Sequence, residues 1–126
     1  MRDKKKRALV VEDEAIVRTF ITNVFEMMDY EVEEADNEEE AWIKFCARES
    51  DLSLIYTDYC LFSGNGLDLY ERIRERNPDI SVVIASGFFN KNYDAIYQDQ
   101  KVCFMNKPLD INEIMQVINK LNPDYC

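Results

Sequence analysis

Charged or hydroxyl side chains stand at the ends of four short apolar runs in this chain of 126 residues. In chain order they are Glu12 with Asp13, Asp58, Ser86 and Lys107. If these runs are parallel strands of one sheet, their carboxyl ends meet at one edge, where open α/β sheets form their binding sites. Three carboxylates held together repel one another, and a hard divalent cation such as Mg²⁺ would relieve that repulsion. The lysine and the hydroxyl would suit the remaining oxygens of a phosphoryl group.

Each of these residues has an ordinary explanation when it is taken alone. Asp58 could be a loop or helix-capping aspartate, because aspartate is common at both positions. The other three endings could be caps or surface charges. Four of five predicted strands ending on charged or reactive groups by coincidence is improbable, however, so we interpret the endings as one site.

Composition restricts the classes of function that the chain can carry. It contains no histidine, which excludes a Ser-His-Asp triad, a Cys-His pair or a histidine-rich zinc site built from this chain alone. The formal net charge is −10, and residues 1–7 are basic, so the remaining body is strongly acidic. An acidic body argues against direct binding of nucleic acid, which needs a basic face. Residues 1–7 are interpreted as a solvated basic leader, with contact to phosphate or lipid as the alternative.

Length and cysteine usage indicate one domain in a reducing compartment. The length fits a single domain, divided into the leader 1–7, a fold over 8–121 and a tail over 122–126. The four cysteines form no CxxC pair, and a chain of this size needs no disulfide framework. No apolar run is long enough to span a membrane, and there is no signal peptide. We therefore expect a cytoplasmic domain without a membrane partner.

The periodicity of apolar residues predicts strands that alternate with helices. Strands are predicted at residues 8–11, 30–35, 52–56, 80–85 and 102–105, the second being half polar and therefore at an edge. Three-and-four spacing predicts helices between them, with Ile16 in the inner face of the first and Ile111 in that of the last. Residues 88–100 favour only a short, weakly amphipathic helix. Five strands and five helices indicate an α/β fold, a three-layer doubly wound parallel sheet.

Local signals mark the ends of several helices. Asn37 and Asp110 are each followed three residues later by a glutamate, which predicts two capping boxes. Residues 63–66, Ser-Gly-Asn-Gly, predict a turn into the third helix. Their glycines begin like a dinucleotide fingerprint, but Leu69 stands where the third glycine belongs, so we discount that interpretation.

The order of an acidic pair, an aspartate, a serine and a Lys-Pro pair, after strands 1, 3, 4 and 5, resembles the receiver domain of two-component response regulators. The resemblance covers residues 8 to about 121. It implies the chemotaxis-regulator fold, a flavodoxin-like five-stranded sheet with strand order 2-1-3-4-5. It also implies Mg²⁺ (or Mn²⁺) as the cofactor and Asp58 as the phosphoryl acceptor. Asp13 and Asp58 would bind the metal directly, Glu12 through water, and Cys60 through its backbone carbonyl.

The resemblance also assigns the residues that respond to phosphorylation. Ser86 would be the switch hydroxyl, Phe104 the switch aromatic residue, and Lys107 the cation that contacts the phosphoryl group. Pro108 would follow a cis peptide bond. Cys60 and Phe88, two residues after Asp58 and Ser86, would tune dephosphorylation, and their apolar character implies slow hydrolysis.

Some positions depart from the family pattern. Glu12 is one methylene longer than the usual aspartate, which a water-mediated metal contact should tolerate. Phe62 stands where proline is usual, so the loop over the metal is expected to be looser. Residues 99–101, Asp-Gln-Lys, replace the usual Gly-Ala before the fifth strand, and Phe104 replaces the commoner tyrosine. None of these changes removes a chemical group that the site needs.

We therefore expect a regulatory phospho-acceptor that assists its own phosphorylation and dephosphorylation and is not otherwise an enzyme. The donor would be a phosphohistidine on a separate histidine kinase or histidine phosphotransfer protein, because this chain has no histidine. The acyl phosphate would switch the face formed by helix 4, strand 5 and helix 5, which would bind an unknown output protein or a second copy of the chain.

Two alternatives from other classes use the same residues. A Mg²⁺-dependent aspartyl-phosphate phosphatase would usually need a second aspartate two residues after Asp58, where Cys60 stands. A degenerate receiver that serves only as a protein-binding module would typically lack the acceptor, the acidic pair or the lysine, and all of them are present.

Overall fold

Five parallel strands form one sheet in the order β2-β1-β3-β4-β5, which confirms the predicted fold class and strand order. The structure is a computed structural model that describes residues 6–87 and 99–122. The strands are β1 (Lys6–Val11), β2 (Tyr30–Ala35), β3 (Leu52–Asp58), β4 (Ser81–Ser86) and β5 (Val102–Asn106). The helices are α1 (Ala15–Met27), α2 (Glu38–Arg48), α3 (Gly66–Arg76) and α5 (Ile111–Leu121). The remaining predicted helix falls mainly on residues 88–98, outside the described residues.

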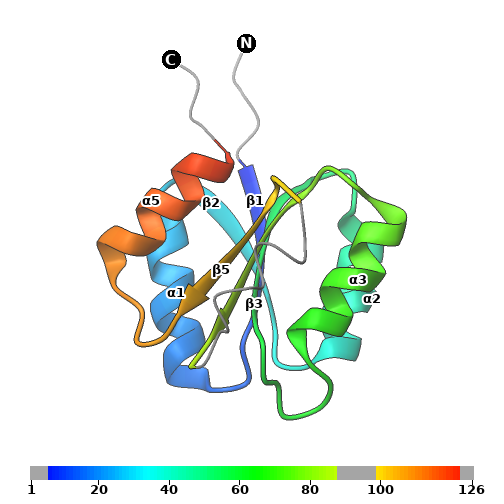
Figure 1. Ribbon diagram of the computed structural model, residues 1–126, viewed down its shortest axis with the longest axis horizontal. Helices are drawn as coiled ribbons and strands as arrows, with labels where there is room; N and C mark the ends of the chain where they lie inside the picture. The colour runs from blue at the N-terminus through cyan, green and yellow to red at the C-terminus, as the bar shows by residue number, and fades with distance from the viewer. Residues whose placement is uncertain (1–5, 88–98, 123–126) are drawn as a thin grey trace.

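Helices cover both faces of the sheet, with α1 and α5 on one side and α2 and α3 on the other (Figure 1). Along β1, Leu9 and Val11 pack in the cluster of α2 and α3, whereas Ala8 and Val10 pack in the cluster of α1 and α5. A strand that is covered on both faces reads as a continuous apolar run, which is why the strands were visible in the sequence.

Strand β2 is at the edge of the sheet, as its polar pattern predicted. Two of its glutamates, Glu31 and Glu33, pair with Arg7 at 2.7 and 3.2 Å. These contacts explain one difference from the prediction. Strand β1 begins at Lys6, two residues before the predicted start, because Arg7 is held against β2 and does not belong to a solvated leader.

The helix caps follow the sequence signals. Asn37 accepts a hydrogen bond from the Glu40 N–H at 2.9 Å, and Asp110 accepts one from the Glu113 N–H at 3.2 Å. The Glu40 carboxylate in turn accepts the Asp36 N–H. Asn65 caps α3 in the same way by accepting the Asp68 N–H at 2.8 Å. Capping therefore sets where three of the described helices begin.

Two residues that the periodicity assigned to inner helix faces are exposed. Ile16, in the first turn of α1, is 87% exposed, and Ile111, the first residue of α5, is 38% exposed. The prediction was wrong at both positions because periodicity identifies a helix face but not where along it burial begins, which is at Ile21 in α1 and Ile114 in α5. Asn122 also differs from its predicted place in the tail, since its side chain donates to the Ser53 carbonyl at 2.8 Å.

None of the described helices has both the length and the apolar character needed to cross a membrane.

Candidate functional site

Charged residues at the carboxyl ends of β1, β3 and β5 lie close together at one edge of the sheet, which we call the carboxyl edge. Oxygens of Glu12, Asp13 and Asp58 lie within 4.8 Å of one another. The Lys107 ammonium lies 2.9 Å from Asp58 Oδ1 and 3.6 Å from Glu12 Oε1. In Figure 1 this edge is at the bottom, below the arrowhead of β5 and beside the loop from β3 to α3. We call Glu12, Asp13, Asp58 and Lys107 the acidic site.

Hydrogen bonds of both its backbone and its side chain hold Glu12 in place. Its N–H donates to the Ala35 carbonyl at 3.0 Å, which extends the pairing of β1 with β2 by one residue. Its carbonyl accepts a bond from Arg18 of α1 at 2.8 Å, and its Oε2 accepts the Glu14 N–H at 3.1 Å. The Glu12 side chain is fully buried as a result.

Asp58 is held by the closely packed end of β3. The N–H of the next residue, Tyr59, donates to the Ala85 carbonyl at 2.7 Å, and the Tyr59 carbonyl accepts the Gly66 N–H at 2.8 Å. A Cβ at Gly66 would lie 2.3 Å from the Asp58 carbonyl oxygen. Only glycine allows the start of α3 to approach the end of β3 this closely.

Among the described residues, the acidic site holds three carboxylates but one cation, Lys107, and burial makes that imbalance costly. The pKa of Glu12 is raised to about 7, mainly by burial and in part by the nearby Asp58 charge, although the hydrogen bond from the Glu14 N–H lowers it. Burial also raises the pKa of Asp58, although Lys107 opposes that shift. Glu12 Oε1 is buried without a hydrogen-bond partner. A buried carboxylate oxygen that accepts no hydrogen bond, and that shares the Lys107 ammonium with Asp58, fits a site for a hard divalent cation.

Lys107 remains a cation in these surroundings. Its partial burial favours the neutral amine, but the hydrogen bond to Asp58 and the charges of Asp58 and Glu12 outweigh this, so the pKa of Lys107 lies above its ordinary value. Its backbone is tied to the neighbouring strand, because the Lys107 N–H donates to the Ser86 carbonyl at 2.8 Å. The predicted cis bond between Lys107 and Pro108 is present.

The structure also places the predicted switch residues. Ser86 is the last residue of β4 and is buried, so its hydroxyl belongs to the same edge of the sheet. Phe104 pairs in register with Ile84 and is partly buried against the cluster of α2 and α3. Phe88 lies outside the described residues. The structure therefore brings Ser86 and Lys107 together at the carboxyl edge, whereas Phe104 lies in the middle of β5, two residues before its end.

Cys60 lies in the loop after β3 rather than in a strand. The residue is exposed, and it forms an isolated antiparallel bridge with Asn65. Phe62, two residues further on, is 92% exposed. The Cys60 backbone is thus set by the loop and its contacts, which spacing in the sequence does not show.

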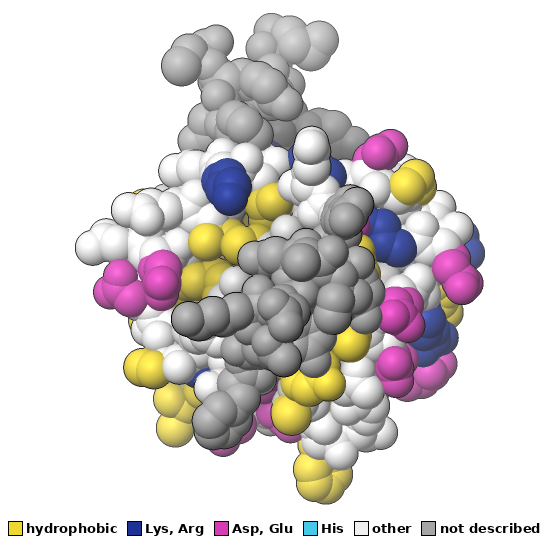
Figure 2. Space-filling model, in the orientation of Figure 1, with side chains coloured by type: hydrophobic (Ala, Val, Ile, Leu, Met, Phe, Trp, Pro, Cys, Tyr) yellow, Lys and Arg dark blue, Asp and Glu magenta, His cyan; other side chains and the backbone are white. Residues whose placement is uncertain are grey.

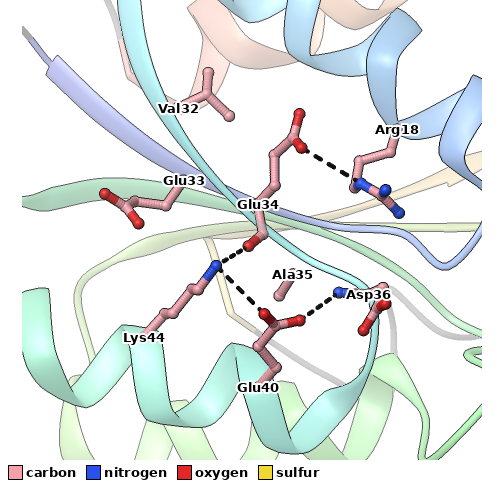
Figure 3. Close-up of a pocket in the computed structure, with 8 residues that line it drawn as sticks. All are labelled: Arg18, Val32, Glu33, Glu34, Ala35, Asp36, Glu40 and Lys44. Atoms are coloured by element: carbon pink, nitrogen blue, oxygen red, sulfur yellow. Dashed lines mark hydrogen bonds and ion pairs between the residues drawn. The ribbon is translucent and has the colours of Figure 1, made fainter.

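A separate cavity of about 390 Å³ lies beside the carboxyl half of β2, between α1 and α2 (Figure 3). Its cations are already engaged. Arg18 pairs with Glu34 at 3.4 Å, and Lys44 pairs with Glu40 at 3.4 Å and donates to the Glu34 carbonyl. Because it shares no lining residue with the acidic site, it offers no group for the same chemistry.

Comparison with known proteins decides the family. The family model of the response regulator receiver domain matches residues 8–119, which is nearly the whole chain. This chain belongs to the response regulator receiver domain family. The fold agrees with this assignment. The receiver domain of HemR from Leptospira biflexa superposes with a TM-score of 0.82 at 25% identity, over 96% of this chain and 100% of that one.

Relatives of this receiver domain include short and long proteins. It is 30% identical to the response regulator receiver protein CpdR of Brucella abortus, over 92% of this chain and 96% of that protein. It is 29% identical to the DNA-binding transcriptional regulator NtrC of Azospirillum brasilense, over 89% of this chain but only 23% of NtrC. The response regulator TrrA of Thermotoga maritima, solved in complex with Mg²⁺-BeF, gives a TM-score of 0.78 at 25% identity, over 92% of this chain and 98% of that one.

Two supporting residues of the receiver domain were missed in the sequence. Arg18 fixes the Glu12 carbonyl from α1, and Gly66 admits α3 to the Asp58 backbone. The Gly-Asn-Gly turn was a signal for Gly66, but only the packing of α3 on β3 shows what that glycine is for. Arg18 carries no local signal, since an arginine in an amphipathic helix is ordinary.

Proposed function

We propose that this receiver domain accepts a phosphoryl group on Asp58 in a reaction that depends on Mg²⁺ (or Mn²⁺). The observation that carries the proposal is the contact of Asp58 with Lys107 at 2.9 Å inside a cluster of three carboxylates. We propose as donor a phosphohistidine on a separate histidine kinase or histidine phosphotransfer protein, since this chain contains no histidine.

Glu12, Asp13, Asp58 and the Cys60 carbonyl would hold the metal ion. The buried Glu12 Oε1, which accepts no hydrogen bond, and the excess of carboxylate over ammonium support this assignment. When bound, the ion supplies positive charge next to the phosphoryl oxygens and so lowers the repulsion between them and Asp58. The complex of TrrA with Mg²⁺-BeF is a precedent in a protein of the same fold.

The transfer itself is a displacement at phosphorus. An Asp58 carboxylate oxygen forms the new bond to phosphorus, the bond from phosphorus to the imidazole nitrogen breaks, and its electron pair stays on that nitrogen. Lys107, which pairs with Asp58 before the reaction, is placed to pair with the transferred phosphoryl oxygens afterwards. Ser86 would offer its hydroxyl to another of these oxygens, and Phe104 would respond to its movement.

The added charge would then change the face that contains β5 and α5. Hydrophobic side chains are visible beside β5 in the space-filling view, to the right of α5 (Figure 2). We propose that this face binds the output protein or a second copy of the chain. On this proposal the domain works in the cytoplasm as a regulatory phospho-acceptor that assists its own phosphorylation and dephosphorylation, and it is not otherwise an enzyme.

Intact-mass spectrometry after incubation with acetyl phosphate tests the proposal. We expect an adduct of one phosphoryl group with Mg²⁺, none with EDTA and none in Asp58→Asn. Asp79→Asn is the matched control, because Asp79 is exposed and outside the acidic site. Rapid turnover to free phosphate without an adduct would instead indicate a phosphatase, and no adduct at all would indicate a protein-binding module. An adduct that survives Asp58→Asn would assign the acceptor to another residue.

Variants of the other proposed residues separate the supporting roles. Lys107→Ala and Ser86→Ala should impair the conformational response to phosphorylation more than they impair Mg²⁺ affinity. A small residue in place of Phe88 should change the decay rate of the adduct severalfold. Loss of Mg²⁺ affinity in Ser86→Ala as complete as in Asp13→Asn would contradict the roles proposed here.

A further inference from the structure

The loop from β3 to α3 carries Cys60, and of its residues 60–64 only Leu61 is buried in the core. Both Cys60 and Phe62 are exposed. The loop is closed on itself by the bridge between Cys60 and Asn65 and by the hydrogen bond from the Gly66 N–H to the Tyr59 carbonyl. A carbonyl on such a loop needs support from elsewhere if it is to keep one orientation.

That support comes from Glu38, the first residue of α2. Its N–H donates to the Ser63 carbonyl at 3.2 Å, and its Oε1 accepts the Asn65 N–H at 3.1 Å. Gly64 makes the approach possible. Its φ is +86°, and a Cβ there would lie 2.3 Å from Glu38 Oε1. Glu38 thus binds the residues on both sides of Gly64, and Asn65 is the residue that bridges to Cys60.

The Glu38 carboxylate is itself held by α3. Arg72 pairs with Glu38 Oε2 at 3.2 Å, and its guanidinium lies 4.4 Å from the centre of the Trp42 ring. The Glu38 side chain is only 15% exposed. Its neighbour Glu39 also reaches Arg72, at 3.7 Å, but is 71% exposed and forms no hydrogen bond with the described residues of the loop. In Figure 2 this side of the molecule, over α2 and α3, shows interspersed acidic and basic side chains.

We propose that Glu38 is a positioning residue for the metal site. By holding the Asn65 N–H, and through it the bridge to Cys60, it orients the Cys60 carbonyl toward the carboxylates. The inference rests on the proposed function, because it takes that carbonyl as a metal ligand. Residues that orient the ligands of a metal commonly change its affinity although they do not touch it. Glu38 lies in α2, whereas the residues of the acidic site lie at the end of β3 or in loops after β1 and β5.

Calorimetric titration with Mg²⁺ alone tests this role. Glu38→Ala removes both the hydrogen bond and the ion pair, and we expect its Mg²⁺ dissociation constant to rise about tenfold. Glu38→Gln keeps an oxygen for the Asn65 N–H and should fall between Glu38→Ala and the wild type. Glu39→Ala is the matched control, because it removes the same charge one residue away without touching the loop.

The outcomes separate this inference from the proposed function. If Glu38→Ala binds Mg²⁺ as tightly as Glu39→Ala, the positioning role is wrong while the metal site stands. If the wild type does not bind Mg²⁺, or Asp13→Asn binds it equally well, both the site and the role are wrong. Equal losses in Glu38→Ala and Glu39→Ala would mean that long-range charge, and not the loop contact, sets the affinity.

Arg72 provides a second variant that leaves Glu38 intact. Arg72→Ala should weaken Mg²⁺ binding by a smaller factor than Glu38→Ala, and it should have no further effect in the Glu38→Ala background. Thermal melts without metal, followed by circular dichroism, select a temperature at which every variant is fully folded. An Arg72 effect that is as large without Glu38 as with it would overturn the proposed connection.

Discussion

Polar groups differ between the carboxyl edge of the sheet, where the strands end, and the amino edge, where the strands begin. At the carboxyl edge, carboxylates are buried beside one another, and Glu12 Oε1 has no hydrogen-bond partner. At the amino edge, neutral groups are hydrogen-bonded: Asn122 donates to the Ser53 carbonyl at 2.8 Å and accepts from the Ser81 hydroxyl at 2.5 Å. The carboxyl edge therefore holds negative charge that a bound cation would balance, whereas the polar groups of the amino edge stabilise the fold.

The amino edge also includes a charged group that is fully engaged. Asp99 accepts hydrogen bonds from Tyr70 at 2.6 Å and from Arg74 at 2.5 Å. Partial burial alone would raise the pKa of Asp99, but these two bonds outweigh it and hold the pKa below its ordinary value. The pKa values of Glu12 and Asp58 are thus raised and that of Asp99 is lowered, so acid should affect the two edges differently.

The largest expected effect is on the amino edge. Asn122→Ala removes a partner from the buried Ser81 hydroxyl and from the Ser53 carbonyl, so we expect a loss of about 2–3 kcal/mol in the free energy of unfolding. Urea denaturation measures it. Asn119→Ala, at an exposed position of α5, is the control and should be close to neutral. Equal stability of the two variants would show that the Asn122 network does not hold the fold.

A smaller effect of opposite sign is expected at the carboxyl edge. Glu12→Gln removes a buried charge next to Asp58 and should stabilise the metal-free protein by about 1–2 kcal/mol at pH 8. The exposed Glu14 provides the matched control, Glu14→Gln. Urea denaturation in EDTA decides the sign, and a variant less stable than the wild type at pH 8 would contradict the electrostatic interpretation of this edge.

The pH dependence of the same variant follows from the direction of the shift. The pKa of Glu12 is raised from 4.5 to about 7, so the folded state binds the proton more tightly than the unfolded state. Stability therefore falls as the pH rises between these two values and levels off above the higher one. The advantage of Glu12→Gln should be present at pH 8 and absent near pH 4.5.

Metal binding should give the next effect. Mg²⁺ at ten times its dissociation constant should stabilise the wild type by about 1.4 kcal/mol, because it binds the folded state preferentially. Thermal melts with and without Mg²⁺ measure this gain. It should vanish in Asp13→Asn, and a gain that persisted there would show that these carboxylates do not form one site.

The smallest effect should be at Asp99. Asp99→Asn should cost about 1 kcal/mol near neutral pH, since it weakens the charged bond to Arg74. A lowered folded pKa means that this stability is present above the ordinary value of 3.8 and is lost as the pH falls through the folded value. Denaturation at pH 7 and pH 2.5 should give a smaller difference at the lower pH. Asp79→Asn, an exposed aspartate, should show no such dependence.

Much of the fold followed from local signals. Strands buried on both faces appear as apolar runs, and the caps at Asn37 and Asp110 lie where the side-chain spacing predicted them. Ile16 and Ile111 were misplaced because helical periodicity identifies a face but not where along the helix burial begins. The start of β1 was misplaced because Arg7 is ordered by pairing with β2, a contact between segments more than twenty residues apart in sequence.

By itself, the sequence determined which groups stand at the carboxyl edge, because parallel strands place their last residues together whatever the loops do. Only the tertiary structure decided how those groups act on one another. Burial of Glu12, the contact of Lys107 with Asp58, and the approach of Glu38 to the loop all depend on side chains from separate helices and strands. The physical reason is that desolvation and charge pairing depend on distances in space, which residue types and spacing do not specify.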